Sequence, residues 1–200
     1  MTTGNEADLT ARARIRLAAL GLFARQGFAG TSLRAIAAEA GVSHALVRHH
    51  YGSKEGLRAA VDEDVLDTFD TALDGMGVQE AGTLAELGAA SAHLFGSDQV
   101  RREYLRRSLL EGGEISARLF ARLLEGARDR LVALGGEVEG PAGRWAPYQV
   151  LFLILGPLVL EPVMAPGLPA PVFDPEVVAE RSRAHQELIA RGLLGAPRTE

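Results

Sequence analysis

The sequence predicts an all-α protein with a compact basic N-terminal part and a larger helical body. Apolar residues recur at helical spacing in most segments, whereas no segment shows the sustained period-two alternation of a strand. No Asn-Gly turn indicates a β-hairpin. We place one domain at residues 1–52 and a second at residues 53–200.

The N-terminal part contains three helix signals in quick succession. The first helix has one apolar face and ends near Gly27. This face consists of Ile15, Ala18, Ala19, Leu22 and Phe23. Thr31 is the expected N-cap of a second helix, which Gly41 stops, and Ser43 is expected to cap a third helix that ends at Gly52.

The rest of the chain also shows helical patterns. A fourth helix starts at Ser53 and runs to about residue 74, and others are expected at about 83–95, 98–111, 114–134, 144–161 and 175–193. Pro157 and Pro162 should kink or end the helix that contains them. The stretch APGLPAPVFDP, residues 165–175, holds four prolines and should form a loop.

The composition and motifs argue against several classes of function. The chain of 200 residues has no cysteine, which excludes disulfides, thiolate zinc sites and a cysteine nucleophile. It also lacks a Gly-rich phosphate loop and the GxSxG and HExxH motifs. We therefore expect no enzymatic activity, no cofactor and no metal.

We expect a soluble cytoplasmic protein that does not enter a membrane. The N-terminus has neither the basic start nor the apolar core of a signal peptide. The longest apolar run, from Val150 to Leu160, is shorter than the roughly 20 residues that a transmembrane helix needs.

Charge is divided unevenly along the chain. Residues 1–60 contain eight lysine or arginine residues and four aspartate or glutamate residues, a net charge of +4. Because the whole chain carries −5, residues 61–200 carry −9. This asymmetry indicates that only the N-terminal part meets a polyanion.

Two short helices joined at residues 40–43 predict a helix-turn-helix. Gly41 permits the tight turn, and Val42, Val47 and Tyr51 should point back toward the first helix. Leu46 and His50 then lie at the margin. The residues left outside are Ser43, His44, Ala45, Arg48 and His49.

A second helix of this kind can enter the major groove of double-stranded DNA. Ala45 allows a close approach, and Arg48 can contact a guanine or hold a phosphate; otherwise it is an ordinary solvated arginine. His49 or His50 can instead be a structural histidine beside Tyr51. The histidine spacing does not place two metal ligands on one helical face.

The stretch TSLRAIAAEAGVSHALVRHHYGSKEGL, Thr31 to Leu57, resembles the DNA-binding signature of the TetR family of bacterial transcriptional regulators. The preceding GLFARQGFAGTS is also similar to that family. The resemblance covers about residues 10–60, a quarter of the chain. Arg48 stands where the family usually has an aromatic residue, and His44 and Leu46 also depart from its commoner residues, which affects the operator sequence expected.

The resemblance implies a role for each matching residue. Thr31 and Ser32 would face phosphate at a helix start, Arg34 would touch base or backbone, and Lys54 would hold a phosphate. Alternatively, Lys54 merely pairs with a neighbouring carboxylate. The residues lining the reading helix would be Ser43, His44, Ala45, Leu46, Arg48, His49 and His50.

A single recognition helix contributes little affinity, so we expect a homodimer on two half-sites about one DNA turn apart. The apolar stretch APYQVLFLILGPLVLEPV and residues 175–193 are the candidate dimer surface; alternatively, both segments pack inside the monomer. The candidate interface residues are Val150, Leu153, Ile154, Leu158, Leu188 and Ile189.

The resemblance also implies a small-molecule effector that binds in the helical body and moves the DNA-binding parts. The candidate lining residues are Phe95, Tyr104, Leu105, Leu109, Phe120, Trp145, Tyr148 and Phe152, with His93, Arg107 and Glu111 as polar contacts. The expected function is that of a ligand-responsive repressor on a palindromic operator. The alternatives are a helical interaction protein that has lost specific DNA binding and an enzyme with a site in the body.

Overall fold

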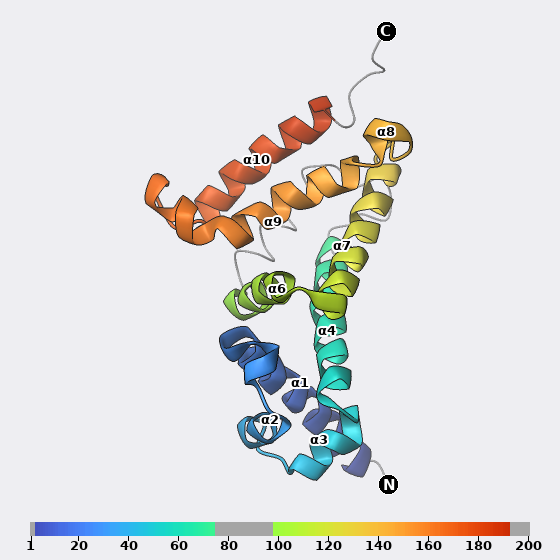
Figure 1. Cartoon of the computed structure of the whole chain (residues 1–200), viewed down its shortest axis with the longest axis vertical. Coiled ribbons are helices and arrows are strands. Elements are labelled where there is room, and N and C mark those ends of the chain that lie inside the picture. The colour runs from blue at the N-terminus through green and yellow to red at the C-terminus, as the bar shows by residue number, and fades with distance from the viewer. Residues whose placement is uncertain (1–2, 75–97, 193–200) are drawn as a thin grey trace. The chain divides into compact units, whose positions relative to one another are not determined.

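The computed structural model describes residues 3–74 and 98–192, and every regular element within these ranges is a helix (Figure 1). The predicted all-α fold class is confirmed. The helix expected at 83–95, together with His93 and Phe95, lies outside the described residues.

The chain packs as two compact units. Unit 1 consists of residues 1–67 and 100–116, and unit 2 consists of residues 68–99 and 117–200. We expected a single division after residue 52. The packing is instead discontinuous, because Leu57, Val61 and Val65 from the fourth helix and Tyr104 and Leu105 from a later helix are all buried in unit 1.

Helix α1, Thr3–Gly30, has the apolar face that its spacing predicts. Ile15 and Ala19 are fully buried, and Leu22 and Phe23 are nearly so. The helix is broken at Gly27, whose φ of 77° and ψ of 167° lie outside the helical region. The predicted end near this glycine therefore corresponds to a break, after which one further turn continues to Gly30.

Helices α2, Leu33–Glu39, and α3, His44–Tyr51, form the predicted helix-turn-helix (Figure 1). Gly41 has the positive φ of 64° that the turn requires. The predicted cap Ser43 is confirmed, since its hydroxyl accepts a 3.1 Å hydrogen bond from the Leu46 amide. The cap predicted for the preceding helix is wrong by one residue, because Ser32 and not Thr31 caps α2.

Two further helices complete unit 1. Helix α4 spans Lys54–Asp74, and helix α6 spans Gln99–Glu111. The Asp64 carboxylate on α4 accepts from Arg16 of α1 at 2.7 Å and from Arg101 of α6 at 3.1 Å. The Tyr104 hydroxyl on α6 donates to Asp62 on α4. Ionic and polar contacts therefore join α1, α4 and α6.

Unit 2 contains most of α7, Gly113–Ala133, followed by α8, Gly140–Gly143, α9, Ala146–Met164, the 3-10 helix η1, Ala165–Gly167, and α10, Pro175–Gly192. Of the two effects expected of Pro157 and Pro162, a kink or an end of the helix, the end is excluded, since α9 continues through both to Met164. Gly156 precedes Pro157 and has no Cβ to clash with the proline ring, and burial of Leu151, Leu155 and Leu158 stabilises the helix.

The segment Gly140–Gly167 is long and apolar enough to cross a membrane by length and composition. Only 22% of its most apolar window is buried. One such helix is weak evidence for a membrane span, because core and interface helices of soluble proteins share this composition.

Candidate nucleic-acid interface

Helix α3 presents one polar face to solvent and one apolar residue to the core. Val47 is 1% exposed and packs inward. The exposed side chains are those that the sequence placed outside, namely Ser43, His44, Ala45, Arg48 and His49. Leu46 and His50 are partly buried at the margin, as expected. The surface that could enter a groove is therefore small and lacks acidic residues.

The end of α3 is fixed to α1 by Tyr51. Its hydroxyl donates a 2.8 Å hydrogen bond to the Arg12 carbonyl, and the Arg12 guanidinium lies 5.7 Å from the centre of its ring. Burial raises the pKa of the Tyr51 hydroxyl. Gly52, with a φ of 72°, then ends the helix. Both ends of the reading helix are thus held by local caps and one long-range bond.

The histidines of α3 lie in different surroundings. The rings of His49 and His50 are 5.4 Å apart, and the His50 ring lies 6.2 Å from that of Tyr51. His44 and His49 are exposed. The contact with Tyr51 favours a structural role for His50. His44 and His49 stay available to a ligand outside the protein. In the described part of the chain, no three metal-ligating residues come together.

The start of α2 offers only part of the predicted phosphate-facing set. Ser32 and Arg34 are exposed, so both can reach a phosphate. Thr31 is 2% exposed, and its hydroxyl donates to the Gly27 carbonyl at 2.8 Å. Its assignment as a DNA contact is therefore corrected: Thr31 closes the end of α1 from inside unit 1.

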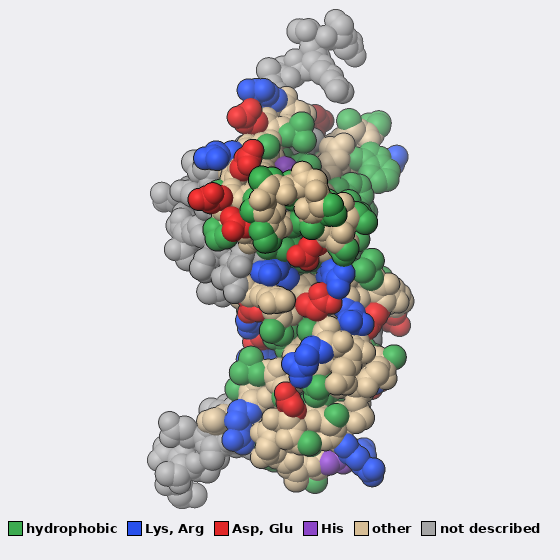
Figure 2. Space-filling view, turned by 90° about the vertical axis from the view of Figure 1, so that its left-hand side faces the viewer, with side chains coloured by type: hydrophobic (Ala, Val, Ile, Leu, Met, Phe, Trp, Pro, Cys, Tyr) green, Lys and Arg blue, Asp and Glu red, His purple; other side chains and the backbone are tan. Residues whose placement is uncertain are grey.

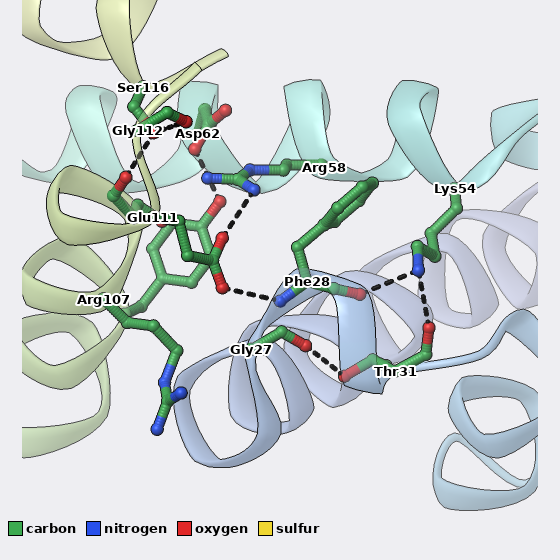
Figure 3. Close-up of polar contacts among 12 residues, drawn as sticks. Gly27, Phe28, Thr31, Lys54, Arg58, Asp62, Arg107, Glu111, Gly112 and Ser116 are labelled. Carbon is green, nitrogen blue, oxygen red and sulfur yellow. Dashed lines mark hydrogen bonds and ion pairs between the residues drawn. The ribbon is translucent and has the colours of Figure 1, made fainter. Parts of the chain in front are cut away.

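Lys54 lies at the first position of α4 and also bonds to the backbone near the end of α1 (Figure 3). Its Nζ donates to the carbonyls of Phe28 at 2.7 Å and Thr31 at 2.8 Å, and lies 4.3 Å from the centre of the Phe28 ring. An ammonium group has three donors, so one is not used by these carbonyls. A phosphate contact through that donor stays a prediction.

Charge around the helix-turn-helix is mainly positive. Figure 2 shows lysine or arginine side chains and a histidine together at the end of unit 1 that holds α2 and α3. The exposed arginines there are Arg12, Arg14, Arg34 and Arg48. Two carboxylates are also exposed: Glu39 pairs with Arg25 at 3.3 Å, and Glu55 has a pKa lowered by hydrogen bonds at the start of α4. These positive charges suit a phosphate backbone.

The residues expected to line an effector site are divided between the two units. Tyr104 and Leu105 are 1% exposed in unit 1, and the Tyr104 ring lies 6.4 Å from that of Phe23, so both are core residues there. Leu109 is partly buried in the same unit. In unit 2, three aromatic rings lie around the ring of Tyr148 with centroid separations of 5.3 to 6.5 Å, which makes a cluster of four. They are Phe120, Trp145, Tyr148 and Phe152.

The candidate dimer residues differ in exposure. Leu158 is 1% exposed within the protomer, so we remove it from the interface. Leu188 is 57% exposed, and Val150, Leu153, Ile154 and Ile189 are partly buried. Leu160 and Val163 lie in the apolar stretch expected at the dimer surface, and both are exposed, although they were not among its individually named candidates.

Residues 15–61 match the family model of bacterial regulatory proteins, tetR family. The helix-turn-helix of this chain is therefore of the TetR-family type. The matched residues include the whole helix-turn-helix described above and the first turns of α4.

Relatives support this assignment. The chain is 42% identical over 127 residues to the HTH-type transcriptional regulatory protein RaaS of Mycobacterium tuberculosis, an alignment that covers 62% of this chain and 57% of RaaS. It is 36% identical over 135 residues to an HTH-type transcriptional repressor of the same species, covering 65% of this chain and 64% of the repressor. The chain thus spans less than two thirds of each of these relatives.

Solved structures share the fold over nearly the whole chain. The crystal structure of the multidrug binding protein EbrR, complexed with imidazole, superposes with a TM-score of 0.63 at 21% identity. The match covers 94% of this chain and 92% of EbrR. The likeness of fold therefore extends beyond the helix-turn-helix to the helical body.

Proposed function

We propose that this protein is a transcriptional repressor of the TetR family that binds a palindromic DNA operator. The exposed face of α3 carries this proposal, because His44, Ala45 and Arg48 project from a capped helix whose opposite side is buried. Such a helix places its N-terminal residues against base edges in the major groove. RaaS and the mycobacterial repressor are named as transcriptional regulators, which supports the same role here.

The proposed assembly is a homodimer that uses α9 and α10. Four apolar side chains on these helices are about half exposed or more: Phe152, Leu160, Val163 and Leu188. Exposed apolar residues gathered on two helices are costly in water unless a partner covers them. A second copy would cover this surface and supply the second recognition helix that a palindrome requires.

The proposed regulation is by a small molecule bound in the body, in the cytoplasm where the operator is found. The aromatic cluster around Tyr148 offers flat apolar surface to such a molecule. EbrR is a multidrug binding protein whose crystal structure contains imidazole, which supports a ligand site in this fold. The effector would favour a conformation of the dimer in which the two helix-turn-helix motifs no longer match both half-sites.

Selection of bound sequences from a random DNA pool tests the proposal. The full-length protein should enrich a palindromic motif, and the His44→Ala/Arg48→Ala double mutant should lose that enrichment while remaining folded. No enrichment by a folded dimer at low salt would refute operator binding and favour a helical protein-interaction role.

A further inference from the structure

The break in α1 at Gly27 leaves two backbone groups without their usual helical partners. In a continuous helix the Phe28 amide would donate to the Ala24 carbonyl, four residues earlier. The positive φ of Gly27 interrupts this pairing. Both groups need other partners, because unpaired backbone groups that are shielded from water destabilise the fold.

Helix α6 supplies both partners. Arg107 Nε donates to the Ala24 carbonyl at 3.0 Å, and its Nη2 lies 3.4 Å from the Arg25 carbonyl. Glu111 Oε1 accepts from the Phe28 amide at 3.0 Å. Arg107 and Glu111, which we call the α6 clamp, are four residues apart and so lie on one face of the helix. The clamp replaces one backbone hydrogen bond of α1 with two bonds to another helix.

The clamp also reaches α4 (Figure 3). Glu111 Oε2 lies 3.0 Å from Arg58 Nη1, and the Arg58 side chain is 4% exposed. The Arg58 guanidinium lies 4.9 Å from the centre of the Phe28 ring. One carboxylate therefore contacts the α1 backbone and a buried cation of α4 at the same time.

The break also makes room for the clamp. A Cβ at Gly27 would lie 2.8 Å from Glu111 Oε1 and 3.4 Å from Arg107 Nη1. The chain turns directly after Glu111 at Gly112 and Gly113, and Ser116 donates to the carbonyls of Ser108 and Gly112. The next residue already belongs to unit 2. The clamp therefore lies close in sequence to the point where the chain passes from one unit to the other.

We propose that Arg107 and Glu111 are positioning residues for operator recognition, which set the orientation of α1–α3 on α4 through the broken turn of α1. This inference rests on the proposed DNA-binding function. If the clamp is lost, the helix-turn-helix still reaches phosphates. It must, however, give up conformational freedom to place its base contacts in both half-sites. The α6 clamp therefore acts on specific binding and hardly at all on non-specific binding.

The test compares Arg107→Gln with Glu103→Gln in the full-length protein. Glu103 pairs with Arg106 on the same helix at 2.7 Å, so its loss disturbs a local ion pair instead of the contact with α1. Arg107→Gln removes the guanidinium bonds to the Ala24 and Arg25 carbonyls and leaves Glu111 paired with the buried Arg58, and Glu111→Gln tests the other side of the clamp. Kd values are measured for the sequence enriched from the random pool and for a random duplex of equal length.

Arg107→Gln and Glu111→Gln should weaken binding to the enriched sequence about tenfold, while the random-duplex Kd stays within about twofold. Glu103→Gln should change neither value. If both Kd values change together, or if neither changes, the positioning role is refuted, since a purely structural effect does not alter their ratio.

Hydrogen exchange separates this outcome from failure of the proposed function. If the wild-type protein enriches no sequence, the function fails, and exchange of the Phe28 amide then tests the clamp alone. Both clamp variants should speed this exchange about tenfold with α3 still protected, whereas Glu103→Gln should not. Equal exchange in all three variants would overturn the positioning role without reference to DNA.

Discussion

The Glu111 carboxylate accepts a 3.0 Å hydrogen bond from the Phe28 amide, although 83 residues separate the two in the chain. The bond is short because Gly27, next to Phe28, has no side chain to hold the carboxylate away. A single backbone break therefore determines where the end of α6 lies on α1 within unit 1.

Gly27→Ala should lower the free energy of unfolding by about 1–3 kcal/mol, since the residue has a φ of +77° and a new Cβ would lie 2.8 Å from Glu111 Oε1. Urea denaturation measures this change. Gly30→Ala is the control, because its nearest contact would be an ordinary 3.8 Å and its φ is not positive. Equal stability of the two variants would show that the carboxylate does not need this space.

Stability should fall at alkaline pH through Tyr104. Burial and the neighbouring Asp62 raise the pKa of its hydroxyl far above the usual value. The unfolded chain loses this proton at about pH 10, whereas the folded chain keeps it, so the free energy of unfolding decreases as pH rises beyond that point. Urea titrations at pH 8 to 11 should show a steeper decline for the wild type than for Tyr104→Phe. Parallel curves would contradict the shift.

Arg48→Ala should weaken operator binding by about 1–3 kcal/mol and relax the preference at one base position. The reason is that Arg48 is exposed on the polar face of α3, so its removal disturbs no core packing. Repeating the DNA selection with the variant measures both effects. A loss that is equal for every sequence would make Arg48 a phosphate contact.

Lys54→Ala should have two effects. Stability should fall by about 1 kcal/mol, because the ammonium bonds to the Phe28 and Thr31 carbonyls are lost. The slope of log K against log salt should become shallower by about one unit if the remaining donor holds a phosphate. Unfolding curves and binding at several salt concentrations distinguish the two, and an unchanged slope would leave Lys54 only its structural role.

Leu188→Asp should convert the dimer to monomer and weaken operator binding together. Leu188 is 57% exposed on α10, so the charge is tolerated in the monomer but not in an apolar interface, and the loss of association should be about tenfold or more. Sedimentation velocity measures the assembly. Val132→Asp, at a 53% exposed site on α7, is the matched control. A normal dimer of Leu188→Asp would exclude this face.

The sequence alone was sufficient for the all-α class, the helix-turn-helix and the outward face of α3. These features depend on short-range chemistry. The Ser43 hydroxyl caps α3 by accepting from the amide of Leu46, three residues later, Gly41 turns the chain, and periodicity turns Val47 inward. Each signal lies within a few residues of the structure that it predicts.

The tertiary structure decided the roles of Thr31, Lys54, Arg107 and Glu111. The family resemblance implied DNA contacts for the first two, and the others were candidate effector contacts, yet all four bond to the backbone near the end of α1. A polar side chain binds whichever partner the fold brings within about 3 Å, and residues 83 positions apart carry no local pattern that reveals such a meeting. The sequence therefore determined which groups are available for bonding, and only the packing of α6 and α4 against the broken turn of α1 decided which of them meet.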